Sequence, residues 1–339
     1  MAQYAVIADD LTGALDAGAG FAAAGLCAVL PLSGLPEDAP GADVVLINTD
    51  SREGNASQAA STTRQAAERL RIAGIGRVYK KIDSVLRGHP GPELAAMLDV
   101  YRGRALVAPA FPAQGRVTRQ GIHYVNGERA APFGGFLRDT LETAAARCDI
   151  RDAETDQDLE RIAHEAAGNA AYRVWCGTAG LARHVPVALG LTSLSGEPRP
   201  QLPIAKRVLV LAGTGHPATN AQLDALAAES IDGVDILVEG RRESSEEHVY
   251  AALKLATADA QLDAQTALIL TGGESALIVC RELGATAIEV TGEALPGIPL
   301  GLLRLPGLTL PVATKSGGFG TPDALLVTAK RLLGDQTPV

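Results

Sequence analysis

The fold is decided by YAVIADDLTGALDAG, residues 4–18. Residues 4–8 have the length of a buried strand, and Asp9 and Asp10 end this run before a helical pattern opens at Thr12. A buried strand that leads through polar residues into a helix is the repeating unit of a parallel sheet with crossover helices. In open sheets of this kind ligands bind beyond the carboxyl ends of the strands, so the two acids lie where a site is expected.

The same alternation of apolar runs and helical patterns recurs along the chain. Further runs are VVLIN (44–48), RVYKKI (77–82), ALVAPA (105–110) and YRVWCG (172–177). A second series follows at RVLVLAG (207–213), VDILVEG (234–240), ALILTGG (267–273) and ATAIEVTG (285–292). Between the two series, residues 186–206 carry four prolines, which deny a regular helix and mark a boundary. We therefore predict two α/β domains, 1–200 and 201–339, each a mostly parallel sheet flanked by helices.

Composition supports this fold class and argues against several kinds of partner. The 339 residues suffice for two domains of ordinary size, and 47% hydrophobic residues with only 4% aromatics suit helices packed on parallel sheets. The formal charge is −9 and no block of basic residues occurs, so no nucleic-acid partner is expected. No apolar run reaches the ~18 to 20 residues of a membrane span, and the N-terminus does not resemble a signal peptide. We expect a cytoplasmic protein without a membrane partner, whose four scattered cysteines are reduced and bind no zinc.

Polar residues cluster after three successive predicted strands of the first domain. The clusters comprise Asp9 and Asp10, then Asp50, Ser51 and Arg52, then Lys81, Asp83, Ser84 and Arg87. Each cluster alone has a structural explanation, because aspartate caps helices and NTDSR (48–52) could form an Asx-turn. Three clusters on neighbouring strand ends favour a site instead. Cationic side chains there would suit a carboxylate, both of whose oxygens a guanidinium can bind, and the acids would suit hydroxyl groups.

A long loop rich in proline and glycine, 108–128, follows the fourth predicted strand. It carries Gln114, Arg116, His123 and Asn126. Because His123 lies between apolar neighbours, we expect it to be a packed histidine rather than a catalyst.

Three glycine-containing loops follow predicted strands of the second domain. They are GTGHP (213–217), TGGES (271–275) and TKSGGFG (314–320). Backbone N–H groups of such loops can bind phosphate, although each loop could also be a tight turn. None is a Walker A motif, since Lys315 precedes its glycines. Three phosphate loops together favour a nucleoside triphosphate, and we expect residues 292–303 to form a loop that shapes its adenine or ribose pocket.

Taken together, these stretches resemble the four-carbon acid sugar kinases. The matching stretches are ADDLTGALDAG, NTDSR, KKIDSVLRG, APAFPAQGRVTRQGIHYVNG, TGGESA, PGIPLG and TKSGGFG, in the family's order from residue 8 to residue 320. The resemblance implies an N-terminal domain that binds a sugar acid, a C-terminal domain that binds ATP, and an active site in the cleft between them. It also implies phosphoryl transfer, with Mg²⁺, to the terminal hydroxyl of erythronate, threonate or a 3-oxo-tetronate. The chain departs from the family by being shorter, by having GTGHP in place of a serine-containing turn, and by having Glu274 where aspartate is usual.

In-line phosphoryl transfer requires positioning and charge neutralisation, and the clusters suggest which residues supply them. Asp10 or Asp9 would orient the attacking hydroxyl and accept its proton. Arg87, with Arg52 and Lys81, would hold the carboxylate or stabilise the transferring phosphoryl group. The other expected substrate-binding residues are Asp50, Ser51, Asp83 and Ser84. The expected ATP-binding residues are Thr214, His216, Gly272, Gly273, Glu274, Ser275, Lys315, Ser316, Gly317, Gly318 and Gly320.

Two other functions remain open from the residues alone. An NAD-dependent dehydrogenase could use the dinucleotide fingerprint of Gly213 and Gly215, with Glu239 on the ribose, but TKSGGFG and the N-terminal acids would then lack a role. A regulatory protein that senses a sugar acid would use the glycine loops only as turns. In each case the expected partner is a small molecule, and a homodimer is compatible with all three.

Overall fold

The computed structural model describes residues 2–130, 135–196, 200–240, 243 and 245–335. Backbone contacts divide the chain into two compact units, Met1–Arg199 and Pro200–Val339, which we call the N-terminal and C-terminal units. Within the described ranges, no helix combines the length and apolar character needed to cross a bilayer. All four cysteines are free.

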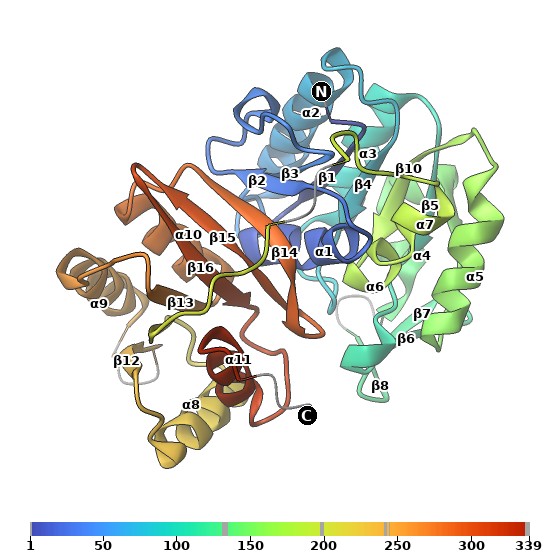
Figure 1. Ribbon diagram of the computed structural model, residues 1–339. Coiled ribbons are helices and arrows are strands. Elements are labelled where there is room, and N and C mark those ends of the chain that lie inside the picture. The colour runs from blue at the N-terminus through green and yellow to red at the C-terminus, as the bar shows by residue number, and fades with distance from the viewer. Residues whose placement is uncertain (1, 131–134, 197–199, 241–242, 244, 336–339) are drawn as a thin grey trace. The chain divides into compact units, whose positions relative to one another are not determined.

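The N-terminal unit is built on a parallel sheet with the strand order β2-β3-β1-β4-β10-β5-β9 (Figure 1). The strands are β1 (Tyr4–Ala8), β2 (Ala28–Pro31), β3 (Val44–Asn48), β4 (Val78–Lys81), β5 (Arg104–Ala108), β9 (Cys148–Ile150) and β10 (Tyr172–Gly177). The predicted apolar runs of this unit are therefore strands, and β1, β3 and β10 begin and end where the sequence predicts. Their residues are nearly all buried, as expected for a parallel sheet covered on both faces.

Crossover helices cover both faces of this sheet. In Figure 1, α2 and α3 pack together on one face, and α1 and α6 on the other. The helices of the unit are α1 (Leu11–Ala23), α2 (Ala56–Ile72), α3 (Pro90–Tyr101), α4 (Leu137–Thr140), α5 (Asp156–Ala167), α6 (Ala179–Ala182) and α7 (Val185–Ala188). The loop after β5 contains a three-stranded antiparallel sheet of β6 (Arg116–Arg119), β7 (Ile122–Val125) and β8 (Glu128–Arg129).

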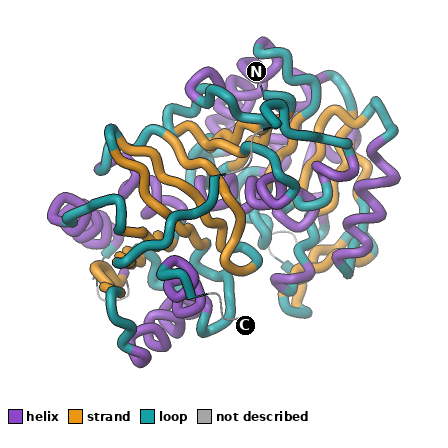
Figure 2. Tube along the Cα trace, in the orientation of Figure 1, coloured by secondary structure: helices purple, strands orange, loops and turns teal. Residues whose placement is uncertain are grey.

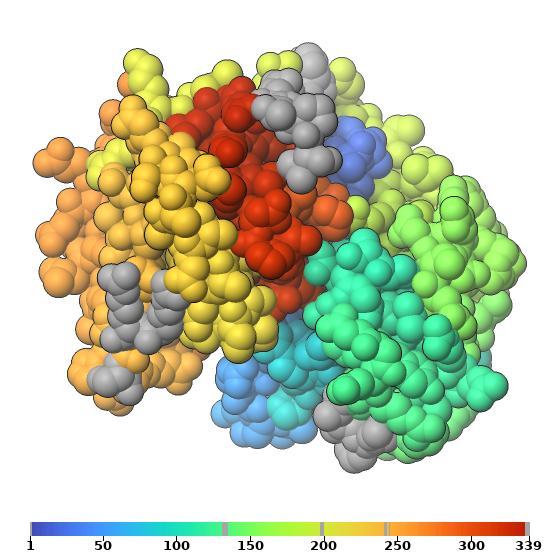
Figure 3. Space-filling view, turned by 90° about the horizontal axis from the view of Figure 1, so that it is seen from below, coloured from blue at the N-terminus to red at the C-terminus, as the bar shows by residue number. Residues whose placement is uncertain are grey.

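The C-terminal unit has a mixed sheet with the order β12-β11-β13-β16-β15-β14, in which β12, β11, β13 and β16 are parallel. The strands are β11 (Arg207–Ala212), β12 (Val234–Glu239), β13 (Thr266–Thr271), β14 (Ala287–Leu295), β15 (Ile298–Leu305) and β16 (Leu308–Lys315). The helices are α8 (Pro217–Glu229), α9 (Glu246–Asp259), α10 (Gly273–Glu282) and α11 (Ala324–Leu332). Apolar residues of α8 and α11 form one core cluster with the sheet, and the two helices lie side by side, yellow and red, in Figure 3.

One expectation about this unit is wrong. Residues 292–303 are not a loop, because they belong to the antiparallel hairpin of β14 and β15, among the long strands of this unit in Figure 2. Only Pro296 and Gly297 separate the two strands, and Gly297 has a φ of 82°, a conformation that glycine adopts without strain. A connection this short can join only antiparallel strands, since a parallel crossover needs about a dozen residues.

Candidate active site

The three polar clusters of the N-terminal unit meet at one edge of the sheet. Strand β1 lies between β3 and β4, and Ala8, the last residue of β1, is in register with Asn48 and Lys81, the last residues of its neighbours. The residues that follow these three strands therefore leave the sheet at the same level, as the sequence predicts.

Arg52 joins the three clusters through its guanidinium group. Its Nε and Nη2 donate to the two carboxylate oxygens of Asp9, both at 2.8 Å, and Nη2 also donates to Asp10 Oδ1 at 2.7 Å. Its Nη1 lies 3.6 Å from Asp83 Oδ1. The Arg52 and Asp9 side chains are only 11% and 3% exposed, so this is a largely desolvated, bidentate ion pair. Gly88 permits the packing, because a Cβ there would lie 3.0 Å from Asp9 Oδ2.

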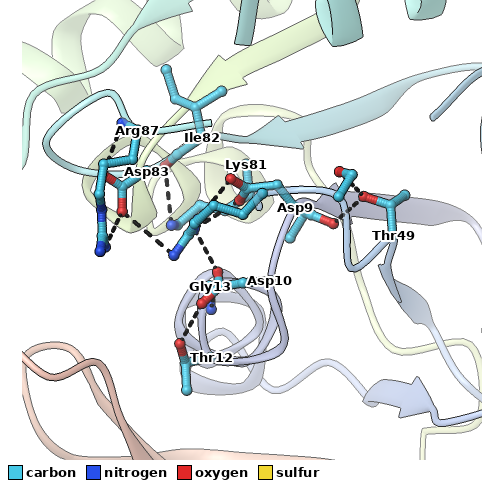
Figure 4. Close-up of polar contacts among 12 residues, drawn as sticks. Asp9, Asp10, Thr12, Gly13, Thr49, Lys81, Ile82, Asp83 and Arg87 are labelled. Carbon is cyan, nitrogen blue, oxygen red and sulfur yellow. Dashed lines mark hydrogen bonds and ion pairs between the residues drawn. The ribbon is translucent and has the colours of Figure 1, made fainter. Parts of the chain in front are cut away.

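Asp10 has two functions that the sequence offered as alternatives. It is the N-cap of α1, accepting from the backbone N–H of Gly13 at 3.0 Å and from the Thr12 hydroxyl at 2.6 Å (Figure 4). It also faces the polar cluster, through its contact with Arg52. Its side chain keeps 13% of its surface exposed, whereas Asp9 is buried behind it. Asp10 is therefore the more accessible carboxylate of the pair.

Arg87 and Asp83 form a second ion pair beside the first. Arg87 Nη2 and Nε donate to Asp83 at 2.7 and 3.1 Å, and the backbone N–H groups of Val85 and Arg87 donate to Asp83 Oδ2 (Figure 4). The Asp83 side chain is 6% exposed but that of Arg87 is 56% exposed. Arg87 therefore presents a cationic surface to solvent while one edge of its guanidinium is fixed.

Asp9 and Asp83 are held in their charged form. Burial alone would raise the pKa of Asp9, but the charge and hydrogen bonds of Arg52 outweigh it and lower that pKa below its ordinary value. Burial likewise opposes ionisation of Asp83, yet the hydrogen bonds from Arg87 and the charge of Arg52 lower the pKa of Asp83. The pKa of Arg52 is raised well above its ordinary value because Asp10 and Asp9 overcome the effect of burial.

The remaining predicted residues lie around this network with different environments. Lys81 is buried, donates from Nζ to the carbonyl oxygen of Ile82, and faces the start of α1, where a Cβ on Gly13 would lie 3.2 Å from Nζ. Asp50 is exposed in the left-handed conformation, and its N–H donates to Asn48 Oδ1 in an Asx-type turn. The Ser84 carbonyl accepts from Nε2 of the fully buried His123, which is thus a packed histidine, as predicted.

Beneath the site lies a buried polar chain that the sequence analysis missed. Ser51 Oγ, expected to bind substrate, instead donates to Glu93 Oε1 at 2.5 Å and contacts Thr49 Oγ1 at 2.8 Å. Glu93, on α3, also pairs with Lys80 Nζ at 2.9 Å, and neither side chain is more than 2% exposed. The sequence contained a signal for this chain. Lys80 and Lys81 are adjacent in one strand, so their side chains must point to opposite faces of the sheet. Both faces of this sheet are covered, so a lysine that points into one of them needs an acidic partner there.

In the C-terminal unit the three glycine loops also leave the sheet at one edge. Ala212, Thr271 and Lys315 end neighbouring parallel strands and are in register with one another. The loops touch, because a Cβ on Gly213 would lie 2.0 Å from Ser275 Oγ, and one on Gly317 would lie 2.9 Å from Thr214 Oγ1. Sequence analysis therefore grouped these loops correctly.

Two helices begin at this edge, one with a side-chain cap and one without. His216 is the N-cap of α8, where its Nδ1 accepts from Ala218 N at 3.2 Å. Gly272 is the N-cap of α10 and no side chain caps that helix, so its first N–H groups have no intrahelical acceptor. Glu274, exposed in the first turn of α10, is hydrogen-bonded by the hydroxyl of Tyr250; burial and this bond raise the pKa of Tyr250. An anion is favoured at such helix ends.

Lys315 is placed differently from the other predicted nucleotide-binding residues. Its side chain is fully buried and its Nζ donates inward to the loop that follows it. Ser316, Gly317, Gly318 and Gly320 remain partly exposed. In the described residues, no group of three or more His, Cys, Asp or Glu side chains is arranged to hold a metal ion.

Comparison with known proteins agrees with this division of the chain. Residues 4–133 match a sugar-binding N-terminal domain family, and residues 234–325 match a nucleotide-binding C-terminal domain family. A D-threonate kinase from Cupriavidus necator is 32% identical, with 95% of this chain and 96% of the kinase covered. Other curated relatives are named D-erythronate and 3-oxo-tetronate kinases. The chain therefore belongs to the four-carbon acid sugar kinase family.

Solved structures show the same fold. A protein from Salmonella typhimurium LT2 superposes with a TM-score of 0.75 at 20% identity, over 98% of this chain and 100% of that one. A Bordetella bronchiseptica protein, crystallised with citrate as a domain-swapped dimer, has a TM-score of 0.50 at 27% identity, with 98% of each chain covered. The alignment with the D-threonate kinase spans 402 positions, more than the 339 residues of this chain, so this member is short, as the sequence analysis noted.

Proposed function

We propose that this protein is an ATP-dependent kinase that phosphorylates the terminal hydroxyl of a four-carbon sugar acid, with D-threonate the first substrate to test. The observation that carries the proposal is that one chain has two differently built sheet edges. The edge around Arg52 presents charged side chains, and the edge around Gly317 presents glycine backbone and helix N-termini. The first suits a hydroxy acid and the second suits phosphate groups.

In this proposal Asp10 accepts the proton of the attacking hydroxyl. Asp10 is favoured over Asp9 because Asp9 is buried with both oxygens bound by Arg52, whereas Asp10 retains exposed surface. Arg87 binds the substrate carboxylate with the exposed part of its guanidinium, which Asp83 holds in place. Citrate bound to the Bordetella relative is in keeping with a site for carboxylates in this family.

The nucleotide would be held by the loops at 214–216, 272–275 and 316–320. Mg²⁺ fits this site as an ion carried mainly by the nucleotide phosphates, because that cation commonly uses only one or two protein carboxylates. Glu274, exposed in the first turn of α10, is the carboxylate in these loops that could hold it. The ion would neutralise phosphate charge during transfer.

The test is an ADP-release assay with a panel of D- and L-threonate, D- and L-erythronate and 3-oxo-tetronates, combined with calorimetry of ATP–Mg²⁺ and NAD. Acid-dependent ADP release is expected. NAD binding without ATP binding would replace the proposal with the dehydrogenase, which would use only the Gly213 turn. Sugar-acid binding without either nucleotide would indicate a sensor.

We further propose a cytoplasmic, dimeric enzyme. A kinase of this kind needs the ATP pool of the cytoplasm, and the domain-swapped dimer of the Bordetella relative favours a dimer here. Light scattering coupled to gel filtration measures the oligomeric state directly.

A further inference from the structure

Lys315 is a buried cation surrounded by oxygen atoms of its own loop. Its side chain has no exposed surface. Its Nζ lies 3.0 Å from Thr219 Oγ1, 3.0 Å from the Ser316 carbonyl oxygen, 3.1 Å from that of Gly317 and 3.2 Å from that of Phe319. Burial lowers the pKa of Lys315 to about 7.

Two side chains of α8 bind the same stretch of backbone from the same side. Thr219 Oγ1 donates to the Gly317 carbonyl at 2.8 Å. Gln222 Nε2, fully buried, donates to the carbonyls of Phe319 at 2.9 Å, Gly320 at 3.2 Å and Thr321 at 2.9 Å. Every carbonyl group from 316 to 321 except that of Gly318 is thus turned toward Lys315 and α8.

The direction of these carbonyls fixes the direction of the amides. In a planar trans peptide the C=O of one residue and the N–H of the next point in opposite directions. Since the carbonyls of Ser316, Gly317 and Phe319 face Lys315, the N–H groups of Gly317, Gly318 and Gly320 face away from it. Among the residues that the structure describes, these three N–H groups have no hydrogen-bond partner. Those of Gly317 and Gly318 are successive, as in a concave anion-binding nest, whereas the N–H of Phe319 donates to the Ser316 carbonyl.

We propose that Lys315 is a positioning residue: its ammonium group holds the carbonyls of Ser316, Gly317 and Phe319 inward, which turns the N–H groups of Gly317, Gly318 and Gly320 outward to bind the phosphates of the nucleotide. This inference rests on the proposed function for the identity of the ligand. It differs from a direct role for Lys315, in which the side chain itself would contact the nucleotide. A lysine in that role would extend from the loop, whereas this one is enclosed by it.

The contact geometry favours the charged form of Lys315. An ammonium group has three N–H donors and no lone pair, whereas a neutral amine has two donors and a lone pair that would face an oxygen atom. The oxygen-lined surroundings of Nζ therefore suit the three donors of the cation better than the two donors and lone pair of the neutral amine. A cation at the centre of the loop also makes the outward face electropositive, which favours an anion there without placing a flexible lysine in solvent.

The test compares Lys315→Met with Gln222→Met, which leaves the lysine in place but removes a second anchor of the same loop, at the carbonyls of Phe319, Gly320 and Thr321. Lys254→Met, at a lysine whose side chain is 57% exposed, is the matched control. Calorimetry of the full-length protein with ADP–Mg²⁺ and inorganic tripolyphosphate measures phosphate binding. Hydrogen–deuterium exchange of the ligand-free protein, read on the peptide that covers 316–321, measures the loop itself.

Both Lys315→Met and Gln222→Met should weaken tripolyphosphate and ADP binding by ~10-fold or more, the effect of losing one hydrogen bond to a charged group. Both should alter exchange of the 316–321 peptide before any ligand is added, while Lys254→Met changes neither and D-threonate binding stays unchanged in all three. Weaker binding in Lys315→Met with unaltered exchange would mean direct contact with phosphate and would overturn the proposal. So would normal phosphate binding in either variant.

Two further readouts keep the inference separate from other failures. If Lys315→Met does not fold, Gln222→Met decides the matter alone. If the wild-type protein binds no nucleotide, the proposed function fails, but the exchange comparison in the ligand-free protein still tests whether Lys315 orders the loop.

The chain has six lysines, so labelling them with ¹³C at Cε gives few NMR signals, and Lys315→Met assigns the buried one. That signal should show an ammonium at pH 6; a neutral amine there would contradict the geometry.

Discussion

Replacement of Asp10 by asparagine distinguishes a catalytic carboxylate from a helix cap. Asp10 accepts from Gly13 N, the Thr12 hydroxyl and Arg52 Nη2. The asparagine oxygen can keep the bonds from Gly13 and Arg52, and its amide can donate to the Thr12 hydroxyl. Asparagine is as good an N-cap as aspartate, and Arg52 keeps its bidentate pair with Asp9. We therefore expect Asp10→Asn to cost no more than about 1 kcal/mol of unfolding free energy.

The effect on turnover should be far larger. An amide cannot accept the proton of the attacking hydroxyl, and loss of a positioned base lowers kcat by ~10² to 10⁴-fold. The KM for the sugar acid should change much less, because the shape of the site and its cations are retained. ADP release under saturating ATP–Mg²⁺ measures kcat and KM, and thermal or urea unfolding of the same preparation measures stability.

The matched variant is Asp9→Asn, which should show the opposite pattern. Both oxygens of Asp9 accept from Arg52 and its side chain is 3% exposed, so an amide would place a donor against the guanidinium. Removing one partner of a buried ion pair costs ~3–5 kcal/mol, and we expect a loss of stability of that order. Near-normal turnover in Asp10→Asn would make Asp10 only a cap and refute the reasoning. A stable but inactive Asp9→Asn would transfer the catalytic role to Asp9.

Three further outcomes are expected. Gly318→Val should abolish ATP binding because a side chain there would cover the N–H groups of the loop. The protein should still fold, since Gly318 is not in the left-handed conformation that favours glycine. Calorimetry measures the binding and circular dichroism measures the fold. Arg87→Ala should raise the KM for the sugar acid more than it lowers kcat, because the lost guanidinium is half exposed; steady-state kinetics would contradict this if only kcat fell. The lowered pKa values of Asp9 and Asp83 mean that these acids stabilise the fold above about pH 4 and cease to do so as the pH falls through their folded-state values. The unfolding free energy should therefore fall on acidification, and fall less in Asp83→Asn.

Much of the fold could be predicted from the sequence because buried parallel strands are short apolar runs with polar ends. Residues 4–8, 44–48 and 172–177 are strands over the predicted ranges. The convergence of the polar clusters followed from one geometrical fact, that parallel strands share a carboxyl edge. The hairpin of β14 and β15 was missed because proline and glycine were taken as signs of a loop, although a two-residue turn between apolar strands contains the same residues.

The side-chain partners at the site could not be predicted, for a physical reason. The sequence shows that Arg52 follows a strand, but not that its guanidinium would bind both carboxylate oxygens of Asp9 rather than a ligand. Likewise, Ser51 lies in a polar motif, yet its hydroxyl turns toward Glu93, more than forty positions along the chain. Such partners depend on which helix lies under which strand, and that is decided by packing of the whole sheet. Lys315 is the strongest case, since it was grouped with the residues expected to bind ATP and its burial indicates a role inside the loop.

The two sheet edges solve different recognition problems with different parts of the polypeptide. A chain with a net charge of −9 cannot attract a polyphosphate by its overall field, so the anion must be met by local donors. Glycine loops supply these donors from the backbone, and the supporting cation at Lys315 lies inside. A hydroxy acid instead presents hydroxyl groups and a carboxylate in fixed directions, which only side chains such as Asp10 and Arg87 can match. Substitution of a side chain at the first edge should therefore change which acid is bound. At the second edge, nucleotide binding should be affected only by substitutions that add a side chain to the loops or remove an anchor of their backbone.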